Sequence, residues 1–337
     1  MEAIILQLFT AVYYEPQSLE YPLGKMLREK YKDLPWIPIE SHNRIEEMTK
    51  KKNSDFPEMK RFLIIGTRKT HKYSDNFKVS DYLVPFTSSG CTAMCLYCYL
   101  VCNYNKCAYL RLFVNREQML ERLIKFSYKS EEEKVFEVGS NSDLILENTI
   151  TGNLEWLIPE FAEKGRGKIT FPTKFDMVGP LLSLDHRGKT IFRMSVNPEK
   201  IIQRIELGTS PLEKRIDALN QMCEAGYPCG ILIAPVVLAE DWETLYSGLL
   251  DTLHSRLSEK VKSRLFIEII FMTYSYVHRA INSEAFPSAV ELYDPQLMTG
   301  RGRGRYTYRS EPRAAAELML REQIKEKLPQ AQIIYVC

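Results

Sequence analysis

Six short apolar runs, separated by stretches of helical periodicity, constrain the fold of this chain most strongly. The runs occupy residues 82–86, 135–139, 168–172, 190–196, 230–237 and 265–271. Between them, segments such as 116–126 and 215–225 carry apolar residues at helical spacing. Strands that alternate with helices form βαβ units around a parallel sheet, with right-handed crossovers. Six such units predict an α/β fold, an open partial barrel of the (β/α)6 kind.

Segments at both ends extend this barrel, and the sequence predicts three parts. Residues 1–80 contain a strand candidate of their own at 62–66 and form an N-terminal α/β extension. Residues 81–290 form the barrel. Residues 291–337 form a C-terminal appendage, with a basic hairpin loop rich in Gly, Arg and Tyr and then a helix.

Composition excludes several classes of protein. The chain has 337 residues, 45% hydrophobic and 26% charged, which is ordinary for a globular protein with a substantial core. Its net charge of only +2 means that any basic surface for nucleic acid must be local. No apolar run is long enough to cross a bilayer, and the N-terminus lacks the features of a signal peptide. We therefore expect a cytoplasmic protein without a membrane partner.

Five of the eight cysteines lie within a short segment that follows the first barrel strand. The string SGCTAMCLYCY places Cys91, Cys95 and Cys98 at CxxxCxxC spacing, where α/β barrels place their chemistry. Three cysteines can hold three irons of a 4Fe–4S cluster and leave the fourth iron open. Structural zinc requires four ligands, so the alternative is a zinc site formed by Cys95, Cys98, Cys102 and Cys107.

The cysteine motif, with Tyr97 before the third cysteine, resembles that of the radical S-adenosylmethionine superfamily. The resemblance implies a 4Fe–4S cluster on Cys91, Cys95 and Cys98, with S-adenosylmethionine on the open iron. Reductive cleavage of that cofactor would give a 5′-deoxyadenosyl radical, and the electron would come from a donor such as flavodoxin or ferredoxin.

Longer strings narrow the resemblance. YYEPQSLEYPLGKMLREKY, SHN, CLYCYL, FRMSVN and GYPCGILIAPV are similar to strings of the bacterial spore photoproduct lyase family at nearly the same spacing. The resemblance implies a DNA repair lyase that reverses a methylene-bridged thymine dimer. The adenosyl radical would remove a hydrogen atom from the lesion, and the bridge between the thymines would then fragment.

The same resemblance implies roles for residues at the strand ends. Cofactor contacts would come from Tyr97, Cys98, Ser142, Lys174, Ser195 and Ala234. A lysine suits a carboxylate, and serine hydroxyls suit a ribose. Tyr97 and Tyr99 would be catalytic, on the radical path that regenerates S-adenosylmethionine. Taken singly, each serine or lysine could also be a helix cap or a solvated side chain.

Three strings depart from the family pattern, all on the substrate side. Ser140 stands where the family has a hydrogen-donor cysteine, and a serine O–H bond is too strong for that role. The sixth strand ends in IFMTY (270–274) in place of a QHRF-like string. The third departure is GRGRGRYTYR (300–309), which gains arginines and lacks a tyrosine of the family string. An alternative is therefore a radical S-adenosylmethionine paralogue with a different, possibly non-DNA substrate.

The arginine-rich string also predicts a DNA contact. Arg301, Arg303 and Arg305 could neutralise phosphates, and Tyr306 could stack on an extruded base. The competing interpretation is a solvated basic loop. Residues 50–52 and 68–72 are weaker candidates for contact with the DNA backbone.

Overall fold

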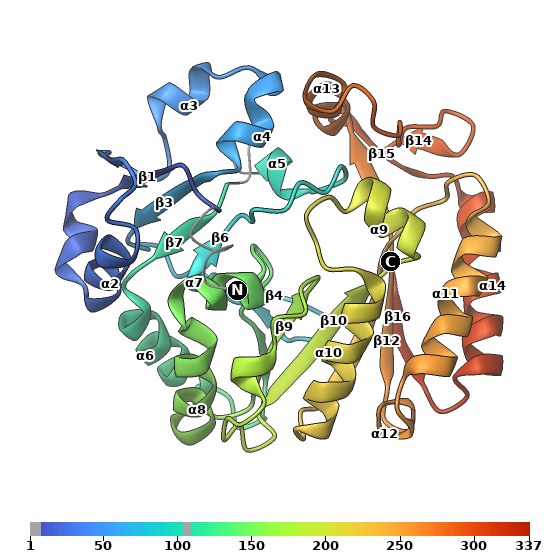
Figure 1. Ribbon diagram of the computed structural model, residues 1–337. Helices are drawn as coiled ribbons and strands as arrows, with labels where there is room; N and C mark the ends of the chain where they lie inside the picture. The colour runs from blue at the N-terminus through green and yellow to red at the C-terminus, as the bar shows by residue number, and fades with distance from the viewer. Residues whose placement is uncertain (1–7, 104–108) are drawn as a thin grey trace. The chain divides into compact units, whose positions relative to one another are not determined.

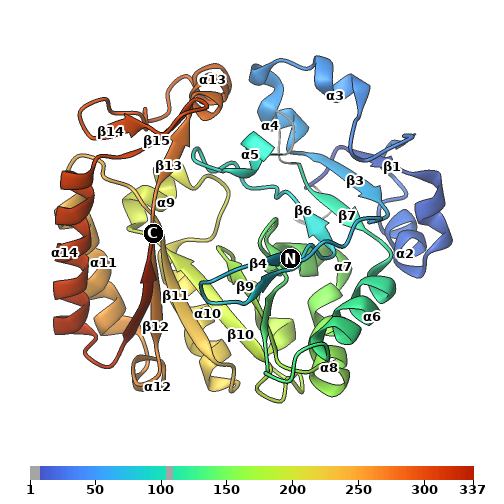
Figure 2. The ribbon, with the colours of Figure 1, turned by 180° about the vertical axis from the view of Figure 1, so that it is seen from behind.

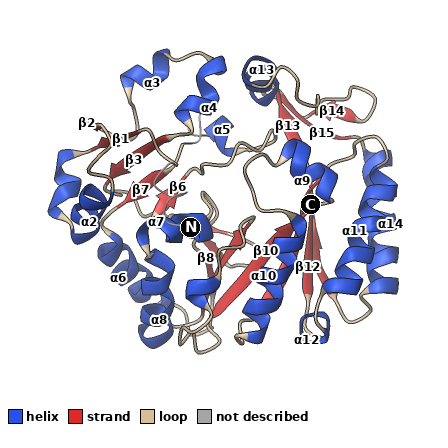
Figure 3. Cartoon of the chain, viewed as in Figure 1, coloured by secondary structure: helices blue, strands red, loops and turns tan. Residues whose placement is uncertain are grey.

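The computed structural model describes residues 8–103 and 109–337, without the side chains of residues 102 and 103. It mixes helices and strands along the whole described chain (Figures 1 and 3). Two compact units emerge: unit 1 contains the residues up to Thr92, Leu100–Phe171 and Leu184–Thr190, and unit 2 contains the rest. Among the described residues, no helix combines the length and the apolar character that a bilayer span requires. The division at residues 80 and 290 stays a proposal.

The six predicted strands and the main predicted helices are confirmed. The strands are β5 (Tyr82–Leu83), β8 (Val135–Glu137), β9 (Lys168–Thr173), β10 (Thr190–Val196), β11 (Cys229–Val236) and β12 (Phe266–Phe271). The helices are α6 (Arg116–Ser127), α10 (Leu212–Glu224) and α14 (Ser310–Lys327). Strand β5 is shorter than expected because Val84–Phe86 lead into the cysteine loop.

Unit 1 contains a five-stranded sheet with the order β2-β1-β3-β7-β6. Its strands are β1 (Ala11–Tyr14), β2 (Trp36–Pro38), β3 (Phe62–Gly66), β6 (Ser88–Ser89) and β7 (Arg111–Phe113). All neighbours are parallel except β6 and β7. Helix α2 (Pro22–Lys30) covers this sheet with Leu23 and Leu27, which pack into one core with Val12, Leu63 and Leu112.

Unit 1 also holds the first barrel strands. Strand β8 pairs in parallel with β5 on one side and with the start of β9 on the other, while β4 (Ser74–Asp75) runs antiparallel to β5. Helix α7 (Leu144–Thr151) begins where the Asp143 carboxylate accepts hydrogen bonds from the amides of Ile145 and Leu146. Gly152, in a left-handed conformation, separates α7 from α8 (Asn153–Lys164).

Unit 2 is built on the parallel strands β10, β11 and β12, which lie side by side in Figure 2. A further strand, β16 (Gln332–Val336), joins the edge of β12 and was not predicted. The connecting helices are α9 (Glu199–Ile205), α10, α11 (Trp242–Arg256) and α12 (Glu259–Lys262). Helix α14 packs along α11.

A small antiparallel sheet with the order β13-β15-β14 completes unit 2. Its strands are β13 (Thr273–Ser275), β14 (Met298–Gly300) and β15 (Arg305–Tyr308), and helix α13 (Tyr276–Ala285) follows β13 directly. This sheet and α14 form the predicted C-terminal hairpin and helix.

Candidate active site

The cysteine loop is held by its backbone on both sides. Gly90, with φ of 81°, donates its N–H to Asn141 O at 2.7 Å in unit 1. In unit 2, Met94 and Leu96 donate to Leu207 O and Ile205 O at 2.8 and 3.0 Å. Backbone hydrogen bonds therefore hold the loop just before Cys91 and around Cys95.

The three predicted cluster ligands are reduced and partly accessible. Cys91 belongs to unit 1, and Cys95 and Cys98 belong to unit 2. Over residues 8–101 and 109–337, whose side chains are described, no three Cys, His, Asp or Glu form a metal-binding group. The fit to a cluster therefore rests on the donor set of three thiols in one loop. Of the zinc alternative, Cys107 and the side chain of Cys102 lie outside the described residues.

Three residues predicted to contact the cofactor meet in unit 2. The Lys174 ammonium donates to Ser195 Oγ at 2.9 Å and to the carbonyl oxygen of Ala234 at 2.7 Å. Ser195 Oγ also donates to Ala234 O at 2.9 Å. Lys174 follows β9, Ser195 lies in β10 and Ala234 lies in β11, so the C-terminal parts of three successive barrel strands converge here.

A buried carboxylate that the sequence analysis missed organises this cluster. Glu206 Oε1 accepts hydrogen bonds from Lys174 Nζ at 2.7 Å and from Asn197 Nδ2 at 2.8 Å. Its Oε2 accepts one from the Arg215 guanidinium at 2.7 Å. The Tyr97 hydroxyl also donates to Oε1. Burial alone would raise the pKa of Glu206, but Lys174 and Arg215 outweigh burial and lower it to about 2.

The pKa of Tyr97 is shifted in the opposite direction from that of Glu206, upwards. The side chain of Tyr97 is buried, and first desolvation and then the charges of Glu206 and Cys95 raise the pKa of its phenol. The phenol therefore stays protonated. Tyr99, two residues later, is 50% exposed. The two predicted catalytic tyrosines thus occupy opposite environments.

Ser142 lies in unit 1, in a separate polar network. Its hydroxyl oxygen lies 2.7 Å from Ser88 Oγ. Behind it, the fully buried Glu147 accepts from Ser88, from Thr87 Oγ1 at 3.0 Å and from Asn153. Burial raises the pKa of Glu147, and its hydrogen bonds oppose that shift. Ser140, two residues before Ser142, is half-buried after β8.

Helix α13 supports the cysteine loop, another feature that the sequence analysis missed. His278 Nε2 donates to Cys98 O at 3.0 Å and Asn282 Nδ2 donates to Leu96 O at 2.8 Å. Ser275 Oγ lies 2.9 Å from His278 Nδ1, and burial lowers the pKa of His278, which fits a neutral imidazole protonated at Nε2. Tyr274, from the divergent string 270–274, stacks on that imidazole with ring centroids 5.1 Å apart.

The arginine-rich string forms the tip of a β-hairpin. Arg301 and Arg305 flank a turn in which Gly302, Arg303 and Gly304 all have positive φ. Arg301, Arg303 and Arg305 are exposed, and Tyr306 is half-buried with its ring centroid 4.5 Å from that of Tyr293. In the described part of the chain, no carboxylate lies within 4.0 Å of these three guanidiniums.

Comparison of the chain with known proteins identifies its family. The family model described as spore photoproduct lyase matches residues 8–337. The chain belongs to the spore photoproduct lyase family. A curated spore photoproduct lyase of Bacillus subtilis (strain 168) is 34% identical, and the match covers 96% of this chain and 97% of that protein. The family is one of lyases, so the chain belongs to a family of enzymes.

Two solved lyase structures match almost the whole chain. A spore photoproduct lyase complexed with dinucleoside spore photoproduct has a TM-score of 0.89 at 28% identity, covering 98% of this chain and 99% of that one. A mutant lyase with bound AdoMet and dinucleoside spore photoproduct has a TM-score of 0.90 at 29% identity, with the same coverage. The predicted partial barrel of the radical S-adenosylmethionine type, with its two extensions, is confirmed by these matches.

Proposed function

We propose that this chain is a DNA repair lyase that reverses the spore photoproduct, a methylene-bridged thymine dimer, by radical chemistry. The observation that carries the proposal is the family match over residues 8–337, supported by structural relatives that hold AdoMet and the dinucleoside lesion. When bound, S-adenosylmethionine and a reduced 4Fe–4S cluster supply a 5′-deoxyadenosyl radical that removes a hydrogen atom from the lesion.

Cys91, Cys95 and Cys98 would hold the cluster, since a loop with three thiols leaves one iron coordination site open. An electron donor such as flavodoxin or ferredoxin would reduce it. The stiff backbone of the Met94–Cys98 segment, bonded to Ile205, Leu207 and α13, would fix the positions of the thiols.

The charges around Lys174 suit the carboxylate of the cofactor. Lys174 and Arg215 carry two positive charges against the single negative charge of Glu206, so this group has one positive charge in excess. The Lys174 side chain is 20% exposed while Glu206 is fully buried, so the ammonium is the accessible member of the pair. Ser195 and Ser142 would bind the ribose hydroxyls of the cofactor. Its adenine would contact the Tyr97 ring, the backbone after Cys98 and Ala234 O.

Tyr97 and Tyr99 would return hydrogen to the adenosyl group after repair. The buried phenol of Tyr97 stays protonated at neutral pH because desolvation and Glu206 raise its pKa, so it keeps the O–H bond that hydrogen transfer requires. Tyr306 and the three arginines of the hairpin would hold the damaged DNA strand.

Anaerobic turnover with dithionite and synthetic dinucleotide lesion tests the proposal. Thymine and 5′-deoxyadenosine should be produced by the wild-type enzyme. Lys174→Ala should raise the Kd for S-adenosylmethionine with the cluster spectrum unchanged, while the exposed Lys164→Ala should change neither. S-adenosylmethionine cleavage without any conversion of the lesion would contradict the proposal and favour a paralogue with another substrate.

A further inference from the structure

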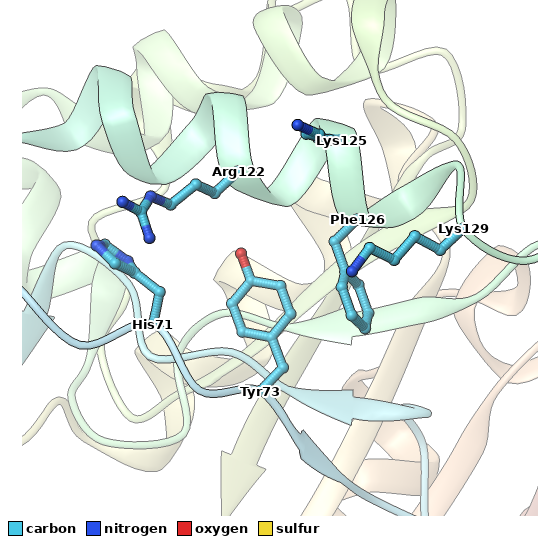
Figure 4. Close-up of a pocket in the computed structure, with 6 residues that line it drawn as sticks. All are labelled: His71, Tyr73, Arg122, Lys125, Phe126 and Lys129. Atoms are coloured by element: carbon cyan, nitrogen blue, oxygen red, sulfur yellow. The ribbon is translucent and has the colours of Figure 1, made fainter.

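A basic cavity in unit 1 has no role in the reaction proposed above. It has a volume of about 340 Å³ and is lined by His71, Tyr73, Arg122, Lys125, Phe126 and Lys129 (Figure 4). Arg122 and Lys125 come from the second half of α6, and Lys129 lies just past its end. The spacing of three residues places Arg122 and Lys125 on one side of the helix, and Lys129 lines the same cavity from the segment that follows.

The cations are available to a ligand. Arg122, Lys125 and Lys129 are exposed, and across the described residues no carboxylate lies within 4.0 Å of them. The pKa of His71 is lowered first by burial and then by the charges of Arg122 and Arg68, as expected in a region of positive potential. Every polar side chain that lines the cavity can donate a hydrogen bond, and none is acidic.

Aromatic rings form the floor of the cavity. Tyr73 meets Phe126 edge to face with ring centroids 4.8 Å apart, and Lys129 Nζ lies 5.1 Å from the centroid of the Phe126 ring. Figure 4 shows the guanidinium of Arg122 beside the His71 ring, with the Tyr73 hydroxyl turned towards the same space. Cations and aromatic rings thus line the same cavity, which favours a ligand that combines phosphate with sugar or base.

A second cavity, of about 200 Å³, shares Phe126 and Lys129 with the first. The second cavity adds Ser130 and Lys134, whose ammonium is paired with Glu132 at 2.6 Å and with Asp81 at 3.8 Å. Because Lys129 lines both cavities, the basic surface extends beyond the first one and suits a ligand with more than one phosphate.

We propose that these two cavities, the α6 trough, bind the sugar–phosphate backbone of the DNA substrate as a second contact in addition to the arginine hairpin. The inference rests on the proposed function for its choice of DNA as the source of phosphate. The trough contributes affinity and orientation through charge, independently of sequence.

DNA binding by variants of the trough tests this proposal. Arg122→Ala/Lys129→Ala should bind a long, undamaged, labelled duplex roughly tenfold more weakly than wild type in an anisotropy titration, and the slope of log K against log salt should fall by about two. Arg122→Lys/Lys129→Arg keeps the charges and should restore most of the binding. Lys25→Ala/Lys214→Ala removes two exposed helical charges elsewhere and should have little effect.

Three further measurements separate the alternatives. Turnover of the dinucleotide lesion should be unchanged in the double alanine variant, because a dinucleotide is too short to occupy the trough. Equal reductions of DNA affinity in the trough and control variants would overturn the proposal, since net charge alone would then explain them. Saturation of the trough by thymidine monophosphate or inorganic phosphate, with duplex binding intact, would also overturn it and indicate a free phosphate ligand.

Two controls guard the interpretation. Cations near a helix C-terminus also stabilise the helix, so the urea midpoint of each variant is measured alongside binding. Unchanged duplex binding, combined with a higher requirement for an acidic flavodoxin, would overturn the proposal in favour of a protein partner. If the wild type fails to repair the lesion while duplex binding still depends on the trough, the proposed reaction is rejected. The proposal that the trough binds DNA is then retained.

Discussion

The Glu206 cluster and the arginine hairpin are both rich in charged side chains, but those of the cluster are paired and largely buried whereas those of the hairpin are exposed. Around Glu206, the carboxylate and Arg215 are buried, Lys174 is only 20% exposed, and each group is held by two or more partners. At the hairpin, three guanidiniums project into solvent from a turn of positive-φ residues. Enclosed, paired charges fix a geometry before any ligand arrives, whereas exposed ones adapt to a flexible strand. The first property suits the cofactor binding proposed for the Glu206 cluster, and the second suits the DNA binding proposed for the hairpin.

The largest expected effect is at the cysteine loop beside the Glu206 cluster. Replacing Cys91, Cys95 or Cys98 with Ala should abolish iron incorporation, the EPR signal of the reduced protein and S-adenosylmethionine cleavage. The buried Cys223→Ala is the matched control and should keep all three. An equal effect in Cys102→Ala or Cys107→Ala would indicate a four-cysteine site instead.

The next effect should come from Glu206→Gln. Removing this charge leaves Lys174 and Arg215 without their common partner, and breaking a buried pair in this way costs about 3–5 kcal/mol of the free energy of unfolding. Urea denaturation measures that decrease. The exposed ion pair of Arg256 with Glu213 provides a control, since Glu213→Gln should cost at most about 1 kcal/mol.

The same carboxylate gives a pH dependence with a definite sign. Glu206 has a folded pKa of about 2 against an ordinary value of 4.5, so its stabilisation is complete above pH 4.5 and is lost as the pH falls towards 2. The difference in unfolding free energy between wild type and Glu206→Gln should therefore shrink over that range. A constant difference would show that Glu206 is not ionised in the folded protein.

A smaller effect is expected at the hairpin. Converting Arg301, Arg303 and Arg305 to Ala should weaken duplex binding and lower the salt slope by about three, one for each phosphate that is no longer neutralised. Because these side chains are exposed, the unfolding midpoint and lesion-free S-adenosylmethionine cleavage should not change. Identical binding isotherms for wild type and the triple variant would show that the hairpin is a solvated basic loop that does not contact DNA.

The smallest expected effect concerns Ser140 and changes which thymine product forms rather than the rate of the reaction. Ser140 cannot return a hydrogen atom to a thymine methyl radical, since its O–H bond is too strong, so wild type should form some abnormal thymine adduct or recycle the cofactor poorly. Ser140→Cys should shift the products, measured by mass spectrometry, towards clean thymine. Clean repair by wild type that survives removal of Cys102 and Cys107 would contradict this expectation.

The sequence predicted the periodic parts of the fold and the residues tied to them. Strands β10 and β12 were found nearly residue by residue, because continuous apolar runs bury both faces of a strand. The family resemblance predicted Lys174, Ser195 and Ala234 as cofactor contacts, and their positions near the C-terminal ends of parallel strands explain why they meet.

Glu206, Arg215 and His278 could not be predicted in the same way. Glu206 follows a short helix in a string without a motif, and Arg215 looks like an ordinary polar residue of an amphipathic helix. Only the packing of α9 and α10 against the strands shows that both are buried and paired. Strand β16 was missed because its residues alternate between exposed and half-buried at a sheet edge, which gives a weak pattern.

Helix α13 is bonded to both the arginine hairpin and the cysteine loop. At its first residue, Tyr276 N–H is bonded to Gly304 O in the hairpin turn at 3.0 Å, and a Cβ on Gly304 would stand 2.5 Å from the Tyr276 ring. Within the next two turns, His278 and Asn282 hold the carbonyls of Cys98 and Leu96. One short helix thus contacts both the hairpin turn and the backbone beside Cys98. If the hairpin holds DNA as proposed, we expect a displacement of the hairpin to reach the carbonyls of Cys98 and Leu96 through α13.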